Sequence, residues 1–361
     1  MSASRDTFYM ARALYLARKG RYTTDPNPRV GCVLVKNDII IGEGWHVKAG
    51  CAHAEVEALK NTPDARGATA YVTLEPCSHF GRTPPCCDAL VNAGISRVVV
   101  AMQDPNPQVS GSGLARLQAA GIEVICGVLQ DEASALNRGF IKRMTEQRPF
   151  VRSKLAMSLD GRTAMASGES KWITSAEARA DVQRLRAESS AILTGINTVL
   201  ADDPALNARV EFDVLQPIRV VLDTQLKMPL TAQMATLPGR SLILTCSEDE
   251  QKQQALQQAG FEVYQLGANN GRLNLQAVMA FLGQQQINEL LVEAGSVLNG
   301  ALLAEGLIDE YVIYMAPCIL GDQGRGLFNL PGLQLMADKK QLKLCDVRQV
   351  GSDLKLTYTP V

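Results

Sequence analysis

The hydrophobic positions near the start of the chain follow two different periods. Residues 6–19 carry apolar side chains at the three- and four-residue spacing of a helix. Residues 30–35 form a continuous apolar run, and the turn residues Asn37 and Asp38 separate it from a second apolar run over residues 39–41. The pattern therefore predicts a helix followed by a β-hairpin.

The change of period repeats through the rest of the first half. Apolar runs predict strands over residues 69–74, 97–102 and 122–125, and helical spacing predicts helices from His53 onward and over residues 88–92, 112–120 and 132–144. Strands that alternate with helices are typical of layered α/β domains. The first half is therefore predicted to be an α/β domain.

A second set of alternating elements begins after Pro149. Strands are predicted from Phe150 and over residues 191–194, 218–222, 242–244, 263–265, 289–293, 311–315 and 354–359, with helices over residues 177–187, 249–258, 275–282 and 297–304. The final strands are expected to return antiparallel. Because 361 residues exceed one typical hydrophobic core, we expect two domains, 1–147 and 148–361, both of the α/β class.

Composition and charge narrow the class of protein. Hydrophobic residues make up 46% of the chain and charged residues 20%, as in ordinary globular proteins. The formal net charge of -1, without a long basic run, argues against a nucleic-acid-binding surface. The first residues lack the apolar segment of a signal peptide, and no apolar run reaches membrane length. A cytoplasmic protein is expected, with neither nucleic acid nor membrane as a partner.

The nine cysteines and three histidines are distributed unevenly. An odd number of cysteines without a signal peptide is not typical of a disulfide framework. All histidines lie in the first domain, so the second has none for metal binding or acid–base catalysis. Five cysteines in apolar runs are predicted to be core residues, namely Cys32, Cys126, Cys246, Cys318 and Cys345.

The segment around His53 carries the strongest chemical pattern of the chain. His53 is followed by Glu55, and Cys77 and Cys86 come after the next predicted strand. One imidazole and two thiolates form a three-ligand zinc set that leaves a fourth position open for water. Glu55 is placed to transfer protons without being a ligand. This is the arrangement of the zinc deaminases of nucleobases, so a hydrolytic deaminase is predicted.

A purely structural zinc site is the alternative interpretation of these residues. Such a site normally closes with four protein ligands, and Cys51 or Cys87 could supply the fourth. Cys51 lies on the approach to the predicted helix, and Cys87 follows Cys86 on a helix, where its side chain faces about 100° away. A structural site also gives no reason for Glu55, which favours the catalytic interpretation.

Two further residues of the first half are candidates for substrate contact. Asn27 lies between two prolines in a loop before the first predicted strand, where binding groups often occur, and a plain turn explains it equally well. His79 lies between the two cysteine ligands, where it could contact substrate or fold the loop.

The spacing of the cysteines indicates a particular family. Zinc deaminases commonly have P-C-x-x-C, whereas here the eight residues 78–85 separate Cys77 from Cys86. The stretch from Thr73 to Cys86, together with the Pro-Asn-Pro segments at 26–28 and 105–107, resembles the bifunctional deaminase/reductase family of riboflavin biosynthesis. The resemblance covers nearly the whole chain.

The resemblance implies two consecutive reactions on a phosphoribosylamino-pyrimidine. The ring amine would be removed by zinc-dependent hydrolysis, and the ribosyl group would then be reduced to ribityl by NADPH. It also implies that Asn27, His79 and Asn106 face the pyrimidine or its phosphate. The implied fold is a cytidine-deaminase-like three-layer α/β/α domain followed by a dihydrofolate-reductase-like α/β domain.

The second half lacks the G-x-G-x-x-G motif of a Rossmann-type dinucleotide site. The apolar strand ending at Glu293 instead runs into Ala-Gly-Ser and a helix that contains Gly300. Glycines at such a turn let a phosphate approach the helix N-terminus, although backbone geometry alone also explains them. The segments 154–161 and 292–295 resemble the reductase domain of the same family.

The family resemblance assigns residues to the two ligands of this domain. The NADPH-binding residues would be Ala156, Trp172, Thr198, Asp202, Thr224, Gly295, Ser296, Val297, Leu298, Asn299, Gly300 and Ala301. The substrate-binding residues would be Ser170, Arg186, Leu206, Arg209 and Glu293. The charges agree in part, because Arg186 and Arg209 can hold a phosphate through bidentate bonds, and Asp202 and Glu293 suit ribose hydroxyls.

The reduction also needs a proton donor beside the reacting carbon. Without a histidine in the second half, we expect Lys154, Asp202 or a water that they position to serve. Relatives associate through the reductase domain, so a homo-oligomer is expected.

Two other classes of protein remain possible from the sequence. One is a single-function zinc nucleobase deaminase with a non-catalytic nucleotide-binding module; if it acted on RNA, it would need a basic stripe, which the net charge does not favour. The other is a structural zinc protein whose second half senses NADP, in which Glu55 would have no role.

Overall fold

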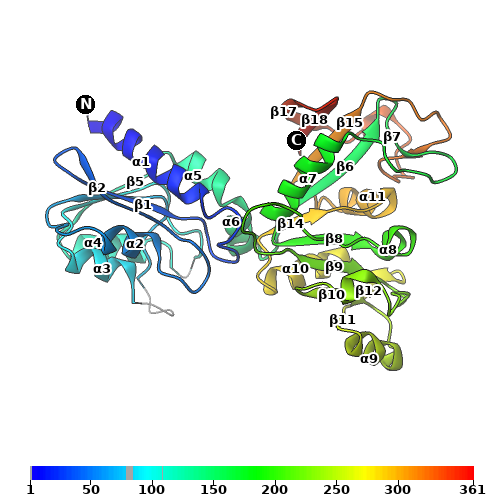
Figure 1. Cartoon of the computed structure of the whole chain (residues 1–361), viewed down its shortest axis with the longest axis horizontal. Coiled ribbons are helices and arrows are strands. Elements are labelled where there is room, and N and C mark those ends of the chain that lie inside the picture. The colour runs from blue at the N-terminus through cyan, green and yellow to red at the C-terminus, as the bar shows by residue number, and fades with distance from the viewer. Residues whose placement is uncertain (1, 79–83, 108) are drawn as a thin grey trace. The chain divides into compact units, whose positions relative to one another are not determined.

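The computed structural model describes residues 2–78, 84–107 and 109–361 (Figure 1). His79, one of the predicted substrate-binding residues, lies outside the described residues. Contacts within the chain define two compact units, Met1–Gln147 and Arg148–Val361. Among the described residues, no helix combines the length and hydrophobicity needed to cross a bilayer.

The first unit is built on a five-stranded sheet with the strand order β2-β1-β3-β4-β5. The strands are β1 (Gly31–Lys36), β2 (Ile39–Trp45), β3 (Thr69–Val72), β4 (Arg97–Val100) and β5 (Glu123–Cys126). β1 pairs antiparallel with β2 and β3, whereas β3, β4 and β5 run parallel. The loops that follow β3 and β4 therefore start from the same edge of the sheet.

Helices cover both faces of this sheet. α1 (Ser2–Arg18), α5 (Gln130–Leu136) and α6 (Arg138–Glu146) lie on one face, and α2 (Ala54–Lys60), α3 (Cys86–Asn92) and α4 (Ser112–Ala119) on the other. Side chains alternate along β1, so Val33 and Val35 pack toward α1 and α5, while Cys32 and Leu34 pack toward α2, α3 and α4. The three-layer α/β/α architecture is confirmed.

Helix α2 lies unusually close to strand β2. A Cβ atom on Gly44 would lie 2.3 Å from the carbonyl oxygen of Ala54 and 2.4 Å from the backbone nitrogen of Ala58. Both contacts are to backbone, which cannot move aside as a flexible side chain could. The absence of a side chain at Gly44 therefore sets the position of α2 against the sheet.

The turn at Asn37 and Asp38 is confirmed, since both residues adopt positive φ values, 52° and 61°, as a two-residue hairpin requires. The single helix predicted over residues 132–144 is wrong, because the chain forms α5 and α6, separated at Asn137. The Asn137 side chain accepts a hydrogen bond from the backbone N–H of Arg29 (2.8 Å) and donates one to its carbonyl (2.9 Å). These bonds hold the helix break against the loop before β1.

The second unit contains a nine-stranded sheet with the order β11-β10-β9-β8-β14-β6-β15-β18-β17. The strands are β6 (Phe150–Ser158), β8 (Ala191–Gly195), β9 (Ile218–Leu222), β10 (Ser241–Thr245), β11 (Glu262–Gln265), β14 (Glu289–Val292), β15 (Glu310–Ala316), β17 (Leu342–Val350) and β18 (Asp353–Pro360). Strands β11 through β15 in this order run parallel, and β18 and β17 are added antiparallel. The predicted antiparallel return is confirmed.

Hydrophobic clusters occupy both faces of the larger sheet. α10 (Leu275–Gln284) and α11 (Ser296–Ala304) pack on one face, and α7 (Ala176–Glu188), α8 (Ile196–Asp202) and α9 (Glu250–Gln258) on the other. Short elements complete the unit, namely β7 (Arg162–Ala164), η1 (Gln233–Ala235), β12 (Ala268–Asn269), β13 (Arg272–Leu273), β16 (Arg325–Gly326) and η2 (Met336–Asp338).

Some expectations for the second unit and the cysteines were incomplete or wrong. Neither α8 nor the edge strand β17 was predicted from the sequence. Most side chains of β17 are exposed, so this strand has no buried apolar run that would indicate it. Cys32 is buried as predicted, whereas Cys126 and Cys345 are exposed and Cys246 and Cys318 only partly buried. An apolar run at a sheet edge therefore does not ensure burial.

A buried ion pair ties α1 to the sheet of the first unit. The Arg97 guanidinium donates to both carboxylate oxygens of Asp6, at 2.9 and 2.8 Å, and the Tyr71 hydroxyl donates to Asp6 at 2.8 Å. The hydrogen bond from Arg97 lowers the pKa of Asp6. Because the carboxyl binds protons less readily when folded, the pair stabilises the fold above the unfolded pKa of about 3.9, and this stability is lost as the pH falls through the lower folded value.

We predict that Asp6→Asn lowers the free energy of unfolding of the first unit by about 1–3 kcal/mol at neutral pH, because a charge-assisted pair is lost. The difference from wild type should shrink below about pH 4. Hydrogen exchange of peptides from α1 and β4 measures the effect. Asp38→Asn is the matched control, since Asp38 pairs with Arg5 at the surface and should contribute under about 1 kcal/mol. A deficit for Asp6→Asn that stayed constant down to pH 2 would contradict the prediction.

Candidate active sites

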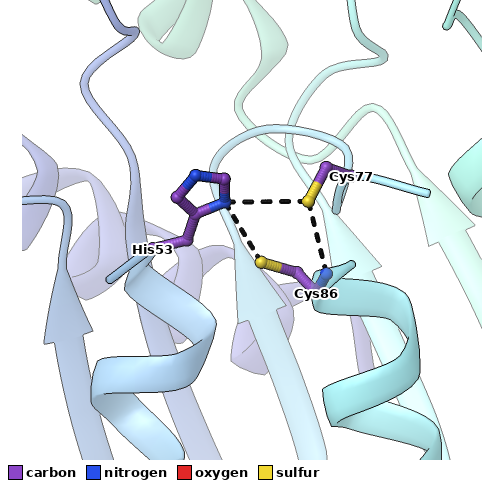
Figure 2. A group of neighbouring side chains, drawn as sticks. All are labelled: His53, Cys77 and Cys86. Carbon is purple, nitrogen blue, oxygen red and sulfur yellow. Dashed lines mark hydrogen bonds between the residues drawn. The ribbon is translucent and has the colours of Figure 1, made fainter. Parts of the chain in front are cut away.

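Three side chains of the first unit converge at the end of its sheet (Figure 2). His53 is the N-cap residue of α2, Cys77 lies in the loop after β3, and Cys86 is the first residue of α3. One nitrogen of His53 and the two sulfur atoms lie within 4.8 Å of one another. We call these residues the His53–Cys77–Cys86 group.

The same imidazole nitrogen faces both sulfur atoms. Nδ1 of His53 lies 3.2 Å from Sγ of Cys86 and 3.7 Å from Sγ of Cys77. The backbone N–H of Cys86, at the N-terminus of α3, donates to Sγ of Cys77 at 3.3 Å. The hydrogen bond between the two thiols lowers the pKa of Cys77 and raises that of Cys86.

Glu55 lies beside this group on the first turn of α2. The residue is only 3% exposed, and burial raises the pKa of its carboxyl to about 6. A hydrogen bond between the Glu55 and Cys86 side chains contributes to the pKa values of both. A buried carboxyl with a pKa near neutrality can both accept and release a proton at physiological pH.

The donor set fits a zinc ion with an open coordination position. Nitrogen and two sulfurs are ligands that zinc prefers, and the metal would replace the proton that the two thiols share. Among the described residues the group has three members. Cys87, the suggested fourth ligand, instead directs its thiol to the carbonyl oxygens of Pro76 (3.2 Å) and Gly113 (3.5 Å). Neither Cys87 nor Cys51 belongs to the group, so the residues that the structure describes supply three ligands and not the four of a closed structural site.

Asn27 is linked to the His53–Cys77–Cys86 group by His46, a histidine that was not predicted to be functional from the sequence. The Nδ2 atom of Asn27 lies 3.0 Å from Nε2 of His46, whose ring packs edge-on against the His53 ring at 5.5 Å. Nδ1 of His46 lies 3.1 Å from the carbonyl oxygen of Ala52 and must donate to it. Nε2 is then the acceptor of the neutral ring, which orients the Asn27 amide. The one sequence signal was that His46 lies seven residues before His53.

Asn106 lies in the loop after β4, which starts from the same sheet edge as the loop carrying Cys77. Its backbone N–H donates to the side chain of Asp104 at 2.8 Å. The residue is partly exposed.

The second unit contains a large cavity at the carboxyl ends of its parallel strands. Its volume is about 2000 Å³, and the ends of β8, β9 and β14 contribute Gly195, Thr224 and Glu293 to its lining. Ligands of open α/β sheets bind outside the carboxyl ends of the strands. This cavity is therefore large enough and correctly placed for a dinucleotide beside a second ligand.

Most of the residues predicted for this domain line the cavity. From the cofactor set these are Ala156, Trp172, Thr198, Asp202, Thr224, Gly295, Ser296, Val297, Leu298 and Ala301, and from the substrate set and the proton donors Ser170, Arg186, Leu206, Arg209, Glu293 and Lys154. The structure thus brings together residues that are up to about 150 positions apart in the sequence.

Asn299 and Gly300 do not line the cavity, although they lie between residues that do. Asn299 is fully buried, accepts a hydrogen bond from Ser153 (2.7 Å) and donates to the carbonyl oxygens of Ala294 (2.7 Å) and Gly295 (3.2 Å). A Cβ atom on Gly300 would lie 2.1 Å from the carbonyl oxygen of Asn329. Both residues face the packed side of α11, so they support the strand-to-helix turn at Gly295 from the side away from the cavity.

The charged residues of the cavity are organised differently from the expected phosphate clamp. Arg186 donates through Nε and Nη2 to the two carboxylate oxygens of Glu293, at 2.6 and 2.9 Å. The Nε and Nη2 side of the Arg186 guanidinium therefore faces Glu293 in this structure, and the phosphate contact of Arg186 stays a prediction. No ion pair of the Arg209 guanidinium is found within the described part of the chain, and Arg209 is exposed at the cavity.

The two candidate proton donors have different surroundings. Burial lowers the pKa of Lys154, and the charges of Glu293 and Arg186 act on it in opposite directions. Asp202 is more exposed and pairs with Lys171 at 2.8 Å. Lys154 is thus the more enclosed of the two residues at the cavity.

Comparison with protein families assigns the two units separately. Residues 3–102 match the cytidine and deoxycytidylate deaminase zinc-binding region, and residues 149–356 match the RibD C-terminal domain. The chain is 53% identical to the riboflavin biosynthesis protein RibD of Escherichia coli, with 97% of this chain and 98% of that protein covered. It is 51% identical to RibD of Haemophilus influenzae, covering 99% and 98%.

Solved structures show the same correspondence over the whole chain. A RibD structure from Acinetobacter baumannii matches with a TM-score of 0.93 and 47% identity, covering 100% of both chains. A diaminohydroxyphosphoribosylaminopyrimidine deaminase/5-amino-6-(5-phosphoribosylamino)uracil reductase from Thermotoga maritima matches with a TM-score of 0.89 and 35% identity, again over 100% of both. The expected fold class is confirmed, and the chain belongs to the RibD family of bifunctional deaminase–reductases in riboflavin biosynthesis.

Proposed function

We propose that this chain converts 2,5-diamino-6-(5-phosphoribosylamino)pyrimidin-4(3H)-one to 5-amino-6-(5-phosphoribosylamino)uracil and then reduces the ribosyl group to ribityl. Residues 1–147 are assigned the deamination and residues 148–361 the reduction. The observation that carries the first assignment is the His53–Cys77–Cys86 group beside the buried Glu55. The names and activities of the relatives support the choice of substrate.

In the deamination, His53, Cys77 and Cys86 would hold one zinc ion, which supplies a water made acidic enough to attack the pyrimidine ring. Glu55 accepts the first proton of that water on its carboxylate and delivers it to the ring nitrogen as the hydroxyl adds to the ring carbon. Glu55 then takes the second proton from the added hydroxyl and gives it to the amine, which leaves as ammonia while the carbonyl forms. Its burial supports this role, because the raised pKa makes proton return favourable. Asn27, oriented by His46, and Asn106 are proposed to bind the pyrimidine or its phosphate, as is His79.

In the reduction, bound NADPH supplies a hydride to C1′ of the ring-opened ribosyl group. Lys154 gives the accompanying proton from its ammonium group to the nascent hydroxyl or imine. The strand-to-helix turn at Gly295 and Ser296, together with Thr198 and Thr224, is proposed to hold the dinucleotide. The peptide N–H groups at the start of α11 favour the negative charge of its phosphates.

The substrate of the reductase site is proposed to lie across the cavity from these residues. Arg209 is free to bind the ribose phosphate, while the Arg186–Glu293 pair presents a fixed carboxylate and spare N–H groups to ribose hydroxyls. Ser170 and Leu206 complete this side, and Asp202 is proposed to position water or a hydroxyl.

We further propose a homo-oligomer that forms through the second unit. The edge strand β17 supports this, because Leu344 and Val347 are each about half exposed on it. A cytoplasmic location is proposed because Cys77 and Cys86 must stay reduced to act as ligands. The alternative of a single-function deaminase is not favoured, since the match to the reductase domain spans residues 149–356.

We predict that Glu55→Gln lowers the deaminase kcat by about 10²–10⁴-fold, because the amide cannot accept or return a proton. Ammonia release measures the rate, and metal content should equal that of wild type. Glu57→Gln on the same helix is the matched control and should retain activity, since the ion pair of Glu57 found among the described residues is with Lys60, at 3.9 Å, and not with the His53–Cys77–Cys86 group. Retained deamination in Glu55→Gln would contradict the mechanism.

We predict that metal removal by a chelator abolishes ammonia release and leaves the second reaction intact, because the His53–Cys77–Cys86 group belongs to the first unit. NADPH oxidation is measured with the deaminated intermediate supplied directly. Zinc should restore ammonia release. A parallel fall in NADPH oxidation would show that the second site also depends on the metal.

We predict that Lys154→Met lowers the reductase kcat by about 10²-fold or more, because the proton donor is removed, and that Asp202→Asn has a smaller effect. NADPH absorbance with the deaminated intermediate gives both values. Lys340→Met, at an exposed position, is the control. If Lys154→Met and Asp202→Asn both kept near wild-type turnover, neither residue would be the donor.

A further inference from the structure

Glu75 is a buried carboxylate that the proposed mechanism does not use. It lies two residues before Cys77, in the loop that follows β3, and is only 4% exposed. Its oxygens accept four backbone N–H groups. Oε2 accepts from Asp104 and Gly111, both at 3.0 Å, and Oε1 accepts from Gly113 (2.8 Å) and Leu114 (3.4 Å).

These bonds cap a helix from another part of the chain. The N-cap residue of α4 is Gly111, which has no side chain with which to satisfy the free N–H groups of the first turn. Glu75 bonds the N–H groups of Gly113 and Leu114, the second and third residues of that helix. The negative charge also suits the positive end of the helix dipole. A residue of the Cys77 loop therefore supplies the cap that α4 lacks.

Further contacts hold the same two loops together. The backbone N–H of Glu75 donates to the carbonyl oxygen of Met102 at 3.0 Å. A Cβ atom on Gly113 would lie 2.1 Å from the carbonyl oxygen of Pro76, so glycine is needed for this approach. The Cys87 thiol donates to the carbonyl oxygens of Pro76 and Gly113. The Cys77 loop and the start of α4 are thus joined along their length.

The residues between Met102 and α4 include Asn106. Glu75 bonds the backbone at Asp104, before Asn106, and at Gly111, after it. The carboxylate therefore holds the backbone on both sides of Asn106, at Asp104 and at Gly111. Because Glu75 lies two residues before Cys77, it links these two backbone positions to the Cys77 loop.

We propose that Glu75 is a positioning residue for deamination, which sets the distance between the substrate contact of Asn106 and the reacting centre at Cys77. This inference rests on the proposed role of Asn106 in substrate binding. Each oxygen of Glu75 is already held by two backbone N–H groups, so the side chain is not directed at the substrate. It acts on substrate binding through Asn106.

Glu75→Gln tests the proposal, because an amide keeps the size of the side chain and replaces one accepting oxygen by a donor that faces N–H groups. The KM for the diaminopyrimidine substrate should rise about ten-fold or more, with a smaller change in kcat. Zinc content should match wild type, and NADPH oxidation with the deaminated intermediate should be unchanged. Glu132→Gln, at an exposed position of α5, is the matched control.

A double-mutant cycle separates positioning from a general structural effect. If Glu75 acts through Asn106, the KM of Glu75→Gln combined with Asn106→Ala should equal that of Asn106→Ala alone within about two-fold. Gly113→Ala keeps the carboxylate but displaces the start of α4, so it should also raise KM. This variant provides the same test if Glu75→Gln accumulates poorly.

Several results would overturn the proposal. These are an unchanged KM in Glu75→Gln, KM effects of Glu75→Gln and Asn106→Ala that multiply in the double variant, and loss of zinc together with activity in both Glu75→Gln and Gly113→Ala. Absence of deamination by the wild-type chain would instead refute the proposed function, so the two failures are distinguishable.

Discussion

The close approach of helix α2 to strand β2 is the constraint on which the first active site depends. Because Gly44 has no side chain, the backbone of α2 lies directly against the sheet at Ala54 and Ala58. His53 and Glu55 flank Ala54 at the start of that helix, so their positions follow from the same contact. A larger residue at Gly44 would displace the imidazole and the carboxyl together, away from the cysteines that β3 and α3 supply.

The two units place different chemistry at equivalent positions of their sheets. In the first, the loops after the parallel strands β3 and β4 carry Cys77 and Asn106, and helix N-termini provide His53 and Cys86. In the second, the ends of β8, β9 and β14 surround the cavity, with a lysine and ion-paired carboxylates in place of imidazole and thiols. The His53–Cys77–Cys86 group and the cavity thus belong to different units of the chain.

The chemistry of the first site could be predicted because its residue types are specific and close in sequence. The sequence shows a recognisable spacing of four residues, namely His53, Glu55, Cys77 and Cys86. Helical periodicity also predicted correctly that the Cys87 side chain faces away from the group. The contacts of His46 and Glu75 were not predicted, because His46 contacts the Asn27 amide and Glu75 contacts backbone N–H groups. No residue type or spacing in the sequence indicates such contacts. The break at Asn137 was missed for the same reason, since its partner Arg29 lies 108 positions away.

In the second unit, residue types alone could not show which side chains face the cavity and which face the packed interior. Asn299 and Gly300 lie on the packed side of α11, and the Arg186 guanidinium forms an ion pair with Glu293. The measurement that most directly tests two sites acting in order is a simultaneous time course of ammonia and NADPH with the wild-type chain. Without NADPH, we expect ammonia to be released as the substrate is consumed. With NADPH, we expect one NADPH to be oxidised for each ammonia released, and ammonia should always appear first. NADPH oxidation that precedes ammonia release, or proceeds without it, would contradict this order.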